Sequence, residues 1–354
     1  MRRAGHFFTA CALVVVLGAG CSAILGIPSE VDRADSDGGG DAPFIPTEAS
    51  GDAVVPGSEA GVDAADAGDA ADAEVIPTGP LCDPTKDFLA PALLTSISKD
   101  GTEGSARLSD DEKTMYFAAQ PAGSATYGLF AATRTVLTDS FQGMALIAGD
   151  VNSASNHEYQ PNLTTDGLTL FFERQDSITE DSDIWMASRA TLAAPFGTAM
   201  PVPGTVNGAA RYDAKVFVRG DGSQFFFSSI LSGSHAHILV ADKTGATWTT
   251  TPVAGVGSVS YDEYSPVITK DGLTMYFASQ RPTPDGSLVG YNIWVAKRTA
   301  VGLAFDEPTL VPAVNSAGFE EPNWVSLDGC RLYLNSNRQA VATRQAIYVA
   351  KRPF

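Results

Sequence analysis

The chain has 354 residues, of which 44% are hydrophobic, so it can bury a sizeable core and is not a wholly disordered protein. Its formal net charge of −18, from 41 acidic against 23 basic residues, argues against a nucleic-acid backbone or an anionic lipid surface as a partner. The four cysteines form no CxxC pair and no cluster with histidine, which argues against a structural zinc site.

The N-terminus has the pattern of a secretory signal. Arg2 and Arg3 precede a short apolar run, residues 10–17, which is too short to span a bilayer permanently. Residues 1–20 are therefore predicted to be removed.

The small residues that end at Cys21 resemble a bacterial lipobox, although Gly18 stands where a large aliphatic residue is usual. This resemblance implies that Cys21 carries the lipid and, with Ser22 after it, that the protein is sorted to the outer membrane in an organism that has two membranes. An acyl anchor also needs a tether behind it. Ordinary cleavage near Gly20, leaving a free thiol on Cys21, is the alternative.

Residues 21–81 are expected to form a disordered acidic linker. Between Glu30 and Glu74 there are thirteen acidic residues and one basic residue, Arg33, with few large apolar side chains. Such a segment cannot bury enough surface to offset the entropy of ordering. Membrane contact is then expected only through the lipid anchor.

A repeat of about 55 residues occupies residues 82–354. Its clearest block is an Asp-Gly-like turn before an apolar strand, and the turn aspartates are Asp111, Asp166, Asp221, Asp271 and Asp328. A second strand-like block begins at Gly128, Asp183, His237, Asn292 and Ala346, and a looser third block begins at Phe141, Phe196, Trp248 and Phe305. With the strand before each turn, this predicts five four-stranded antiparallel blades, an all-β five-bladed β-propeller.

The two ends of the repeat region predict how the ring closes. The fifth repeat stops at Phe354 after its third strand, and residues 88–94 match the missing outer strand. Pairing between them would remove the free sheet edges. Cys82 and Cys330 would both lie in this fifth blade, so we expect a disulfide between them in an exported protein. Two buried free thiols are the alternative.

The Asp-Gly turn, the E-x-x-P before it and the aromatic-Val-Ala-x-Arg strand after it resemble the WD40-like propeller repeat of TolB-type bacterial envelope proteins. The resemblance covers residues 88–354 and implies the fold more than any activity. It also implies six blades and an extra N-terminal domain for TolB itself. This chain instead has five predicted blades and an acidic linker. The resemblance therefore does not imply that it belongs to the envelope system in which TolB acts.

A carboxylate stands about eight residues before each turn aspartate. These five are Glu103, Glu158, Asp213, Glu263 and Glu320, with Glu321 as an alternative to the last. At the mouth of the channel they would form a ring for a ligand or for a hard cation such as calcium. Alternatively, each accepts hydrogen bonds from its own loop or pairs with Arg174, Arg281 or Arg338.

The sequence offers no nucleophile elbow, phosphate-binding loop or catalytic residue that we can assign. His157, His235 and His237 are either loop residues or a metal site, and Tyr291 and residues 261–264 either pack between blades or contact a ligand. We therefore predict a monomeric, non-catalytic envelope module, without a cofactor, that binds a protein, peptide or glycan. The alternative is a five-bladed glycoside hydrolase that uses the channel-mouth carboxylates.

Overall fold

The computed structural model describes residues 82–98, 103–177, 179, 181–208, 211–231, 235–258, 260–288, 290–338 and 345–354. The predicted signal peptide, the predicted lipidation site Cys21 and the predicted linker lie outside these residues. Within them the chain forms twenty β-strands. None of the described residues belongs to a helix that could cross a membrane.

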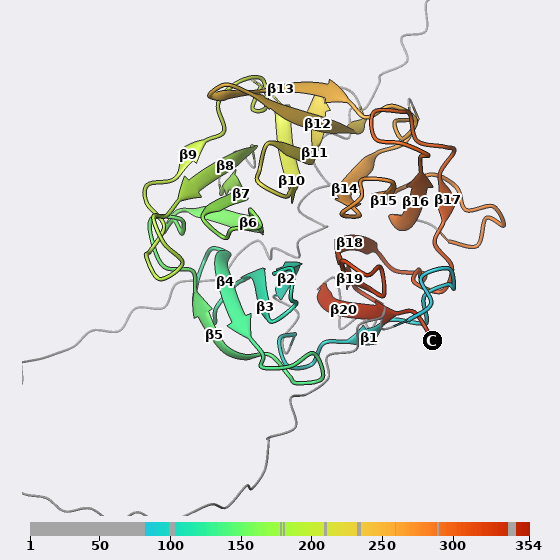
Figure 1. The fold of residues 1–354 in the computed structure, drawn as a ribbon, viewed down its shortest axis with the longest axis horizontal. Helices are drawn as coiled ribbons and strands as arrows, with labels where there is room; N and C mark the ends of the chain where they lie inside the picture. The colour runs from blue at the N-terminus through green and yellow to red at the C-terminus, as the bar shows by residue number, and fades with distance from the viewer. Residues whose placement is uncertain are drawn as a thin grey trace, which may run out of the picture. The chain divides into compact units, whose positions relative to one another are not determined.

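The strands form five four-stranded sheets, and in each sheet neighbouring strands are antiparallel. Figure 1 shows the sheets arranged around a common centre, with β2, β6, β10, β14 and β18 innermost. The predicted all-β, five-bladed β-propeller is confirmed.

The blades follow the chain in order. Blade 1 contains β2 (Glu103–Leu108), β3 (Thr114–Ala119), β4 (Gly128–Thr133) and β5 (Gln142–Leu146). Blade 2 contains β6 (Asn156–Leu163), β7 (Thr169–Asp176), β8 (Ser182–Ser188) and β9 (Met200–Pro201). Blade 3 contains β10 (Arg211–Arg219), β11 (Gln224–Leu231), β12 (Ala236–Thr244) and β13 (Thr247–Pro252). Blade 4 contains β14 (Glu263–Ile268), β15 (Thr274–Ser279), β16 (Asn292–Lys297) and β17 (Thr309–Leu310).

Blade 5 is completed by the N-terminal end of the described chain. It contains β18 (Glu320–Val325), β19 (Arg331–Ser336), β20 (Ala346–Lys351) and the short outer strand β1 (Ala92–Leu93). β1 pairs with β20, as the sequence predicted. The expected disulfide joins Cys82 to Cys330, which are 248 residues apart in the chain. Both ends of the ring are therefore held in one sheet.

The repeated turn residues form a local hydrogen-bond motif. In blade 1, Oδ1 of Asp111 accepts hydrogen bonds from the Ser109 hydroxyl at 2.6 Å and from the backbone N–H of Lys113 at 3.0 Å. The Ser109 hydroxyl holds the pKa of Asp111 below its ordinary value. Blades 2, 4 and 5 repeat these contacts around Asp166, Asp271 and Asp328. The motif stabilises the hairpin between the first two strands.

A repeated arginine links the third strand to the aromatic residue of the outer element. The guanidinium carbon lies 4.5 Å from the ring centroid in the pairs Arg134–Phe141, Arg189–Phe196 and Arg298–Phe305, and 4.1 Å in Arg352–Phe88. Arg352 thereby clamps the closing segment as the other arginines clamp their own blades. The repeated residues thus serve the blade.

Neighbouring blades also meet through glycine. Gly255 has φ +88°, and a Cβ atom at this position would lie 2.0 Å from the carbonyl oxygen of Phe305 in the next outer element. Gly149 and Gly204 make the same approach to Phe196 and Trp248. Only glycine permits this backbone contact between outer elements.

The second strand of each blade supplies the core. Its alternate side chains are fully buried at equivalent positions, which are Met115 and Phe117, Leu170 and Phe172, Phe225 and Phe227, Met275 and Phe277, and Leu332 and Leu334. The period of two matches the pleat of a strand that is covered by a neighbouring sheet.

We predict that breaking the Cys82–Cys330 bond lowers the free energy of unfolding by about 5 kcal/mol, because the bond closes a very long loop in the unfolded chain. Urea denaturation of the oxidised protein, the reduced protein and the double variant Cys82→Ser/Cys330→Ser measures this difference. The last two should agree with each other. Equal free energies of unfolding for all three proteins would show that the disulfide does not stabilise the closed ring.

We predict that Gly255→Ala lowers the free energy of unfolding by at least about 3 kcal/mol, because the new Cβ collides with the backbone of Phe305. The matched control is Gly286→Ala, at φ +67° with no atom within 4 Å of the added Cβ. It should cost only about 1 kcal/mol of backbone strain. Equal losses in the two variants would rule out the proposed backbone contact as the cause.

Candidate functional site

The five predicted carboxylates lie at the beginning of the inner strands, and all are buried: Glu103, Glu158, Asp213, Glu263 and Glu320. In four of them the carboxylate oxygens bind the loop that precedes the strand. Glu158 accepts from the N–H of Ser153 at 3.1 Å, Asp213 from Gly208 at 3.1 Å, Glu263 from Ser258 at 3.1 Å and Glu320 from Ser316 at 3.0 Å. Each of these four carboxylates therefore holds its own loop.

Three of these carboxylates also pair with arginine from the second strand or just after it. Glu158–Arg174 and Glu263–Arg281 are 2.9 Å apart, and Glu320–Arg338 are 3.3 Å apart. Burial raises the pKa of Glu158 to about 7, while the amide of Ser153 and the charge of Arg174 act in the opposite direction. In the described part of the chain, no three Asp, Glu, His or Cys residues come together as a metal-binding group. Glu158, Glu263 and Glu320 are thus bound within their own blades.

The other sequence candidates also have structural contacts. His157 accepts a hydrogen bond from the N–H of Tyr127 at 3.1 Å and stacks on Tyr159. Tyr291 is only 7% exposed and packs edge-on against Tyr264 and Phe319, so it joins blades 4 and 5. These aromatic residues serve packing between blades, one of the two alternatives that the sequence left open.

A β-bulge lies in the inner strand of every blade. In blades 1 to 4 it places a residue other than glycine in the left-handed region: Ser105 at φ 60°, Gln160 at 53°, Lys215 at 60° and Ser265 at 53°. Such a residue costs about 1–2 kcal/mol of strain, so the surrounding structure must hold it. A bulge also changes the direction in which a strand presents its side chains.

The bulges bring charged residues of different blades together. Nζ of Lys215 in blade 3 lies 2.9 Å from Oε1 of Glu321 in blade 5, and the Ser265 hydroxyl of blade 4 donates to the same oxygen. Burial by itself lowers the pKa of Lys215, but Glu321 and Glu173 outweigh burial and raise it above the ordinary value. The lysine is therefore charged, and it links two blades that are not neighbours.

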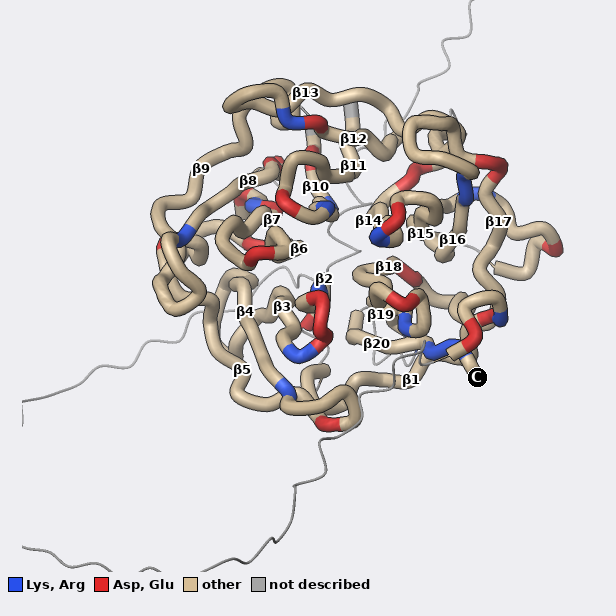
Figure 2. Tube along the Cα trace, in the orientation of Figure 1, with Lys and Arg blue, Asp and Glu red and all other residues tan. Residues whose placement is uncertain are grey.

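Arg107 of blade 1 adds a second link across the centre. Its guanidinium donates to the carbonyl of Asn323 in blade 5 and, at 3.2 Å, to that of Val216 in blade 3. Arg107 is 2% exposed, and burial lowers its pKa to about 9 against the effect of Glu321. Figure 2 shows both signs of charge around the centre, on the inner strands and their turns.

A cavity of about 680 Å³ opens at the other end of the inner strands, where the Asp-Gly turns lie. All five blades contribute to its lining, and Arg107 is one of the lining residues. Its size is that of a site for a small ligand. This cavity is the candidate functional site, and the predicted carboxylates do not line it.

Nine of the residues that line the cavity stand at two positions at which the repeats differ. The inner-strand residue that pairs with the third residue of the second strand is Arg107, Asn162, Phe217, Val267 or Trp324, in blade order. The residue before the turn aspartate is Asp110, Thr165, Gly220, Lys270 or Leu327. All of these except Val267 line the cavity. Their variation makes the site asymmetric within a nearly symmetric fold.

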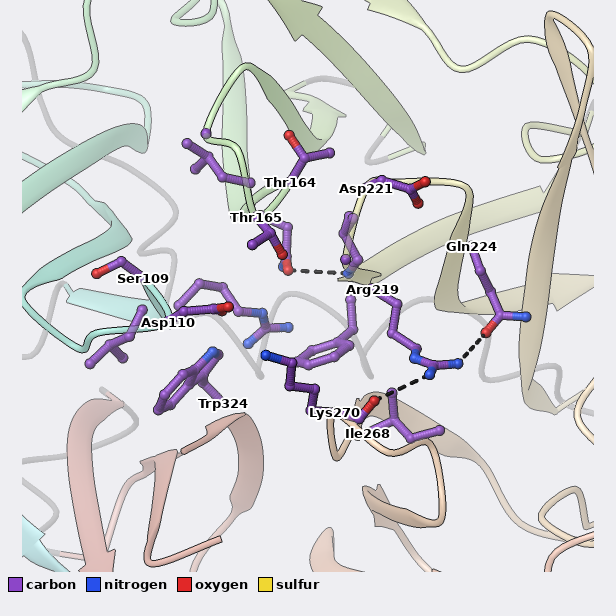
Figure 3. A pocket seen from close by; sticks show the side chains of 18 of the residues that line it. Ser109, Asp110, Thr164, Thr165, Arg219, Asp221, Gln224, Ile268, Lys270 and Trp324 are labelled. Carbon is purple, nitrogen blue, oxygen red and sulfur yellow. Dashed lines mark hydrogen bonds between the residues drawn. The ribbon is translucent and has the colours of Figure 1, made fainter. Parts of the chain in front are cut away.

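The rim contains few free polar groups. In Figure 3 the side chains of Asp110, Lys270 and Trp324 converge from three blades on the middle of the cavity. Arg219 is engaged, since it donates to Gln224 at 3.0 Å and to the carbonyl of Lys270 at 3.2 Å. No described residue accepts a hydrogen bond from Nζ of Lys270 in the structure. Lys270 and Asp110 are therefore available to a ligand.

Reasoning from the sequence missed this site because it followed the residues that recur. The signal that would have found it is a position at which the repeats differ. When the five repeats are aligned, one inner-strand position holds a basic residue, an amide, two aromatic residues and a valine. Such a position cannot be explained by the needs of the blade alone.

No protein-family model matches the chain, and no curated protein matches it. Among solved structures, the chain is similar to TolB from Acinetobacter baumannii, with 14% identity and a TM-score of 0.42 over 71% of this chain and 55% of that one. It thus covers about half the length of that TolB.

Two further structures have comparable similarity. A TolB structure from Agrobacterium tumefaciens is 12% identical, with a TM-score of 0.43 over 71% of this chain and 78% of that one. The catalytic domain of the Coprinopsis cinerea GH62 α-L-arabinofuranosidase is 9% identical, with a TM-score of 0.46 over 76% of this chain and 97% of that one. At these identities the similarities say nothing about the activity of this chain.

We predict that Lys215→Met lowers the free energy of unfolding by about 3–5 kcal/mol, because it leaves the buried charge of Glu321 unpaired. The double variant Lys215→Met/Glu321→Met should recover most of this loss. Urea denaturation of the wild type, both single variants and the double variant measures the coupling. Additive losses would show that the ion pair does not link the two blades.

Proposed function

We propose that this chain is an exported, lipid-anchored binding module of the cell envelope. It recognises a protein, peptide or glycan through the propeller face that carries the central cavity, and it does not catalyse a reaction. The observation that carries this proposal is the asymmetry of the cavity. The repeats keep the same residues where the blade needs them and differ where their side chains meet around one ligand-sized space.

The disulfide supports the exported location. A bond between Cys82 and Cys330 persists in an oxidising compartment and is rare in the cytosol. The signal-like N-terminus and Cys21, outside the described residues, agree with this location and supply the anchor.

The glycoside hydrolase alternative has less support. It needs two carboxylates beside the substrate in different environments. The candidates for that role, such as Glu158 and Glu263, are 0% exposed and bind their own loops. In the cavity itself, Asp221 and Asp242 accept hydrogen bonds from Ser223 and Gln224, which leaves Asp110 as one available carboxylate rather than a pair. This arrangement suits recognition better than acid–base chemistry.

Filling the cavity tests the proposal. Thr165 is an exposed rim residue, so Thr165→Trp should block the cavity without disturbing the core. The matched control is Thr191→Trp, in an exposed loop outside the cavity. Binding to glycan and peptide arrays, and capture from native envelope extracts, are measured for the full chain and both variants.

We expect the wild type and Thr191→Trp to retain a ligand that Thr165→Trp loses by about tenfold or more in affinity. Equal binding by all three proteins would place the site elsewhere. A complete lack of binding would contradict the function. Release of reducing sugar from a polysaccharide panel would favour the hydrolase alternative.

A further inference from the structure

The charges of the cavity indicate the chemical class of its ligand, an inference that rests on the function proposed above. The first observation is Arg107 at the base of the cavity. It is buried, its guanidinium donates to backbone carbonyls and lies 5.5 Å from the ring centroid of Phe217, and the nearby carboxylate of Glu321 is paired with Lys215. Nε of Arg107 is buried without a hydrogen-bond partner. A buried cation without its own carboxylate is costly and attracts an anion.

The second observation is Lys270 on the rim. Its ammonium group points to the middle of the cavity in Figure 3, and none of the described residues accepts a hydrogen bond from it. It lies in blade 4, whereas Arg107 lies in blade 1, so two separate elements place positive charge around the same space. Arg219 adds a second guanidinium to the lining, and Lys243 adds a second ammonium group. An anionic group inside the cavity would be stabilised from several sides.

The outer lining limits how much negative charge the ligand can carry. Asp110, Asp221 and Asp242 also line the cavity, where they largely balance four basic residues, Arg107, Arg219, Lys243 and Lys270. A ligand with many negative charges would therefore meet carboxylates as well as cations. A ligand with a single carboxylate can place it near Arg107 and Lys270 and avoid the carboxylates.

The lining also favours a saccharide over a peptide as the ligand. Protein and peptide ligands are usually anchored by apolar side chains that enter open hydrophobic pockets. Most apolar lining residues are buried, namely Leu108, Phe217, Val218, Ile268, Trp324 and Val325, so the cavity wall offers little open apolar surface. Leu327 on the rim is the exception and is 44% exposed. The free groups are instead a carboxylate, an ammonium group and the hydroxyl-bearing side chain of Thr165. Sugar hydroxyls can donate to the first and accept from the second.

We propose that the cavity binds an acidic saccharide with one carboxylate, which lies above Arg107 and pairs with Lys270, while Asp110 accepts hydrogen bonds from the sugar hydroxyls.

Calorimetry with a matched pair of disaccharides tests this proposal. The probes are cellobiouronic acid, which carries one carboxylate, and cellobiose, in which a hydroxymethyl group replaces it. N-acetyl-dialanine with a free carboxylate represents a peptide end. The proteins are the wild type, Lys270→Ala, Arg107→Gln and the control Lys297→Ala, which removes an exposed lysine that does not line the cavity.

The wild type should bind cellobiouronic acid about tenfold more tightly than cellobiose. Lys270→Ala should weaken binding of the acid by about three- to tenfold and leave cellobiose unchanged, and Lys297→Ala should change neither. Arg107→Gln should remove the preference for the acid, and circular dichroism shows whether it folds. Because Lys270 is exposed, its variant decides the question even if Arg107→Gln is unfolded.

Equal affinity for both disaccharides, or an unchanged preference in Lys270→Ala, would overturn the proposal. Tighter binding of N-acetyl-dialanine would replace the saccharide by a peptide end. If neither disaccharide binds, the acidic saccharide is wrong, whereas the proposed binding function still depends on whether Thr165→Trp loses its array or envelope ligand.

Discussion

The structure depends on closing a ring whose two ends lie far apart in the chain. The closing strand contributes only two paired residues, Ala92 and Leu93, so strand pairing by itself holds the ring closed only weakly. The stacking of Arg352 on Phe88 and the disulfide to Cys330 reinforce it. If the ring opened, blades 1 and 5 would no longer be held together. The cavity would then lose its shape, because these two neighbouring blades both contribute to its lining.

Within the closed ring, polar groups fall into two kinds. Those that recur in every blade find partners a few residues away, as Asp111 does in its turn and Glu158 does in its loop. Those that occur once find partners in other blades, as Lys215 does with Glu321 across the centre. Local partners stabilise each blade, whereas distant partners specify how the blades are arranged and leave charge near the cavity.

Glu320 and Glu321 illustrate why the sequence could be interpreted only in part. Adjacent in the chain, they are both almost completely buried, yet Glu320 binds its own loop and Arg338 while Glu321 points to another blade. A spacing of eight residues from the turn aspartate favours Glu320, but it does not show what Glu321 contacts, because the partner of Glu321 lies in another blade. Similarly, Tyr291 was a candidate contact residue until its packing against Tyr264 and Phe319 was known.

The sequence by itself determined the strands, the number of blades, the strand that closes the ring and the cysteine pair that joins its ends. These follow from a period of about 55 residues and from strand patterns that repeat along the chain. Only the tertiary structure decided which side chains meet at the centre. Residues such as Arg107, Lys270 and Trp324 belong to different repeats, and no local pattern records a distance across the ring. The site consequently lies where the repeats differ, and it exists only when all five blades surround one axis.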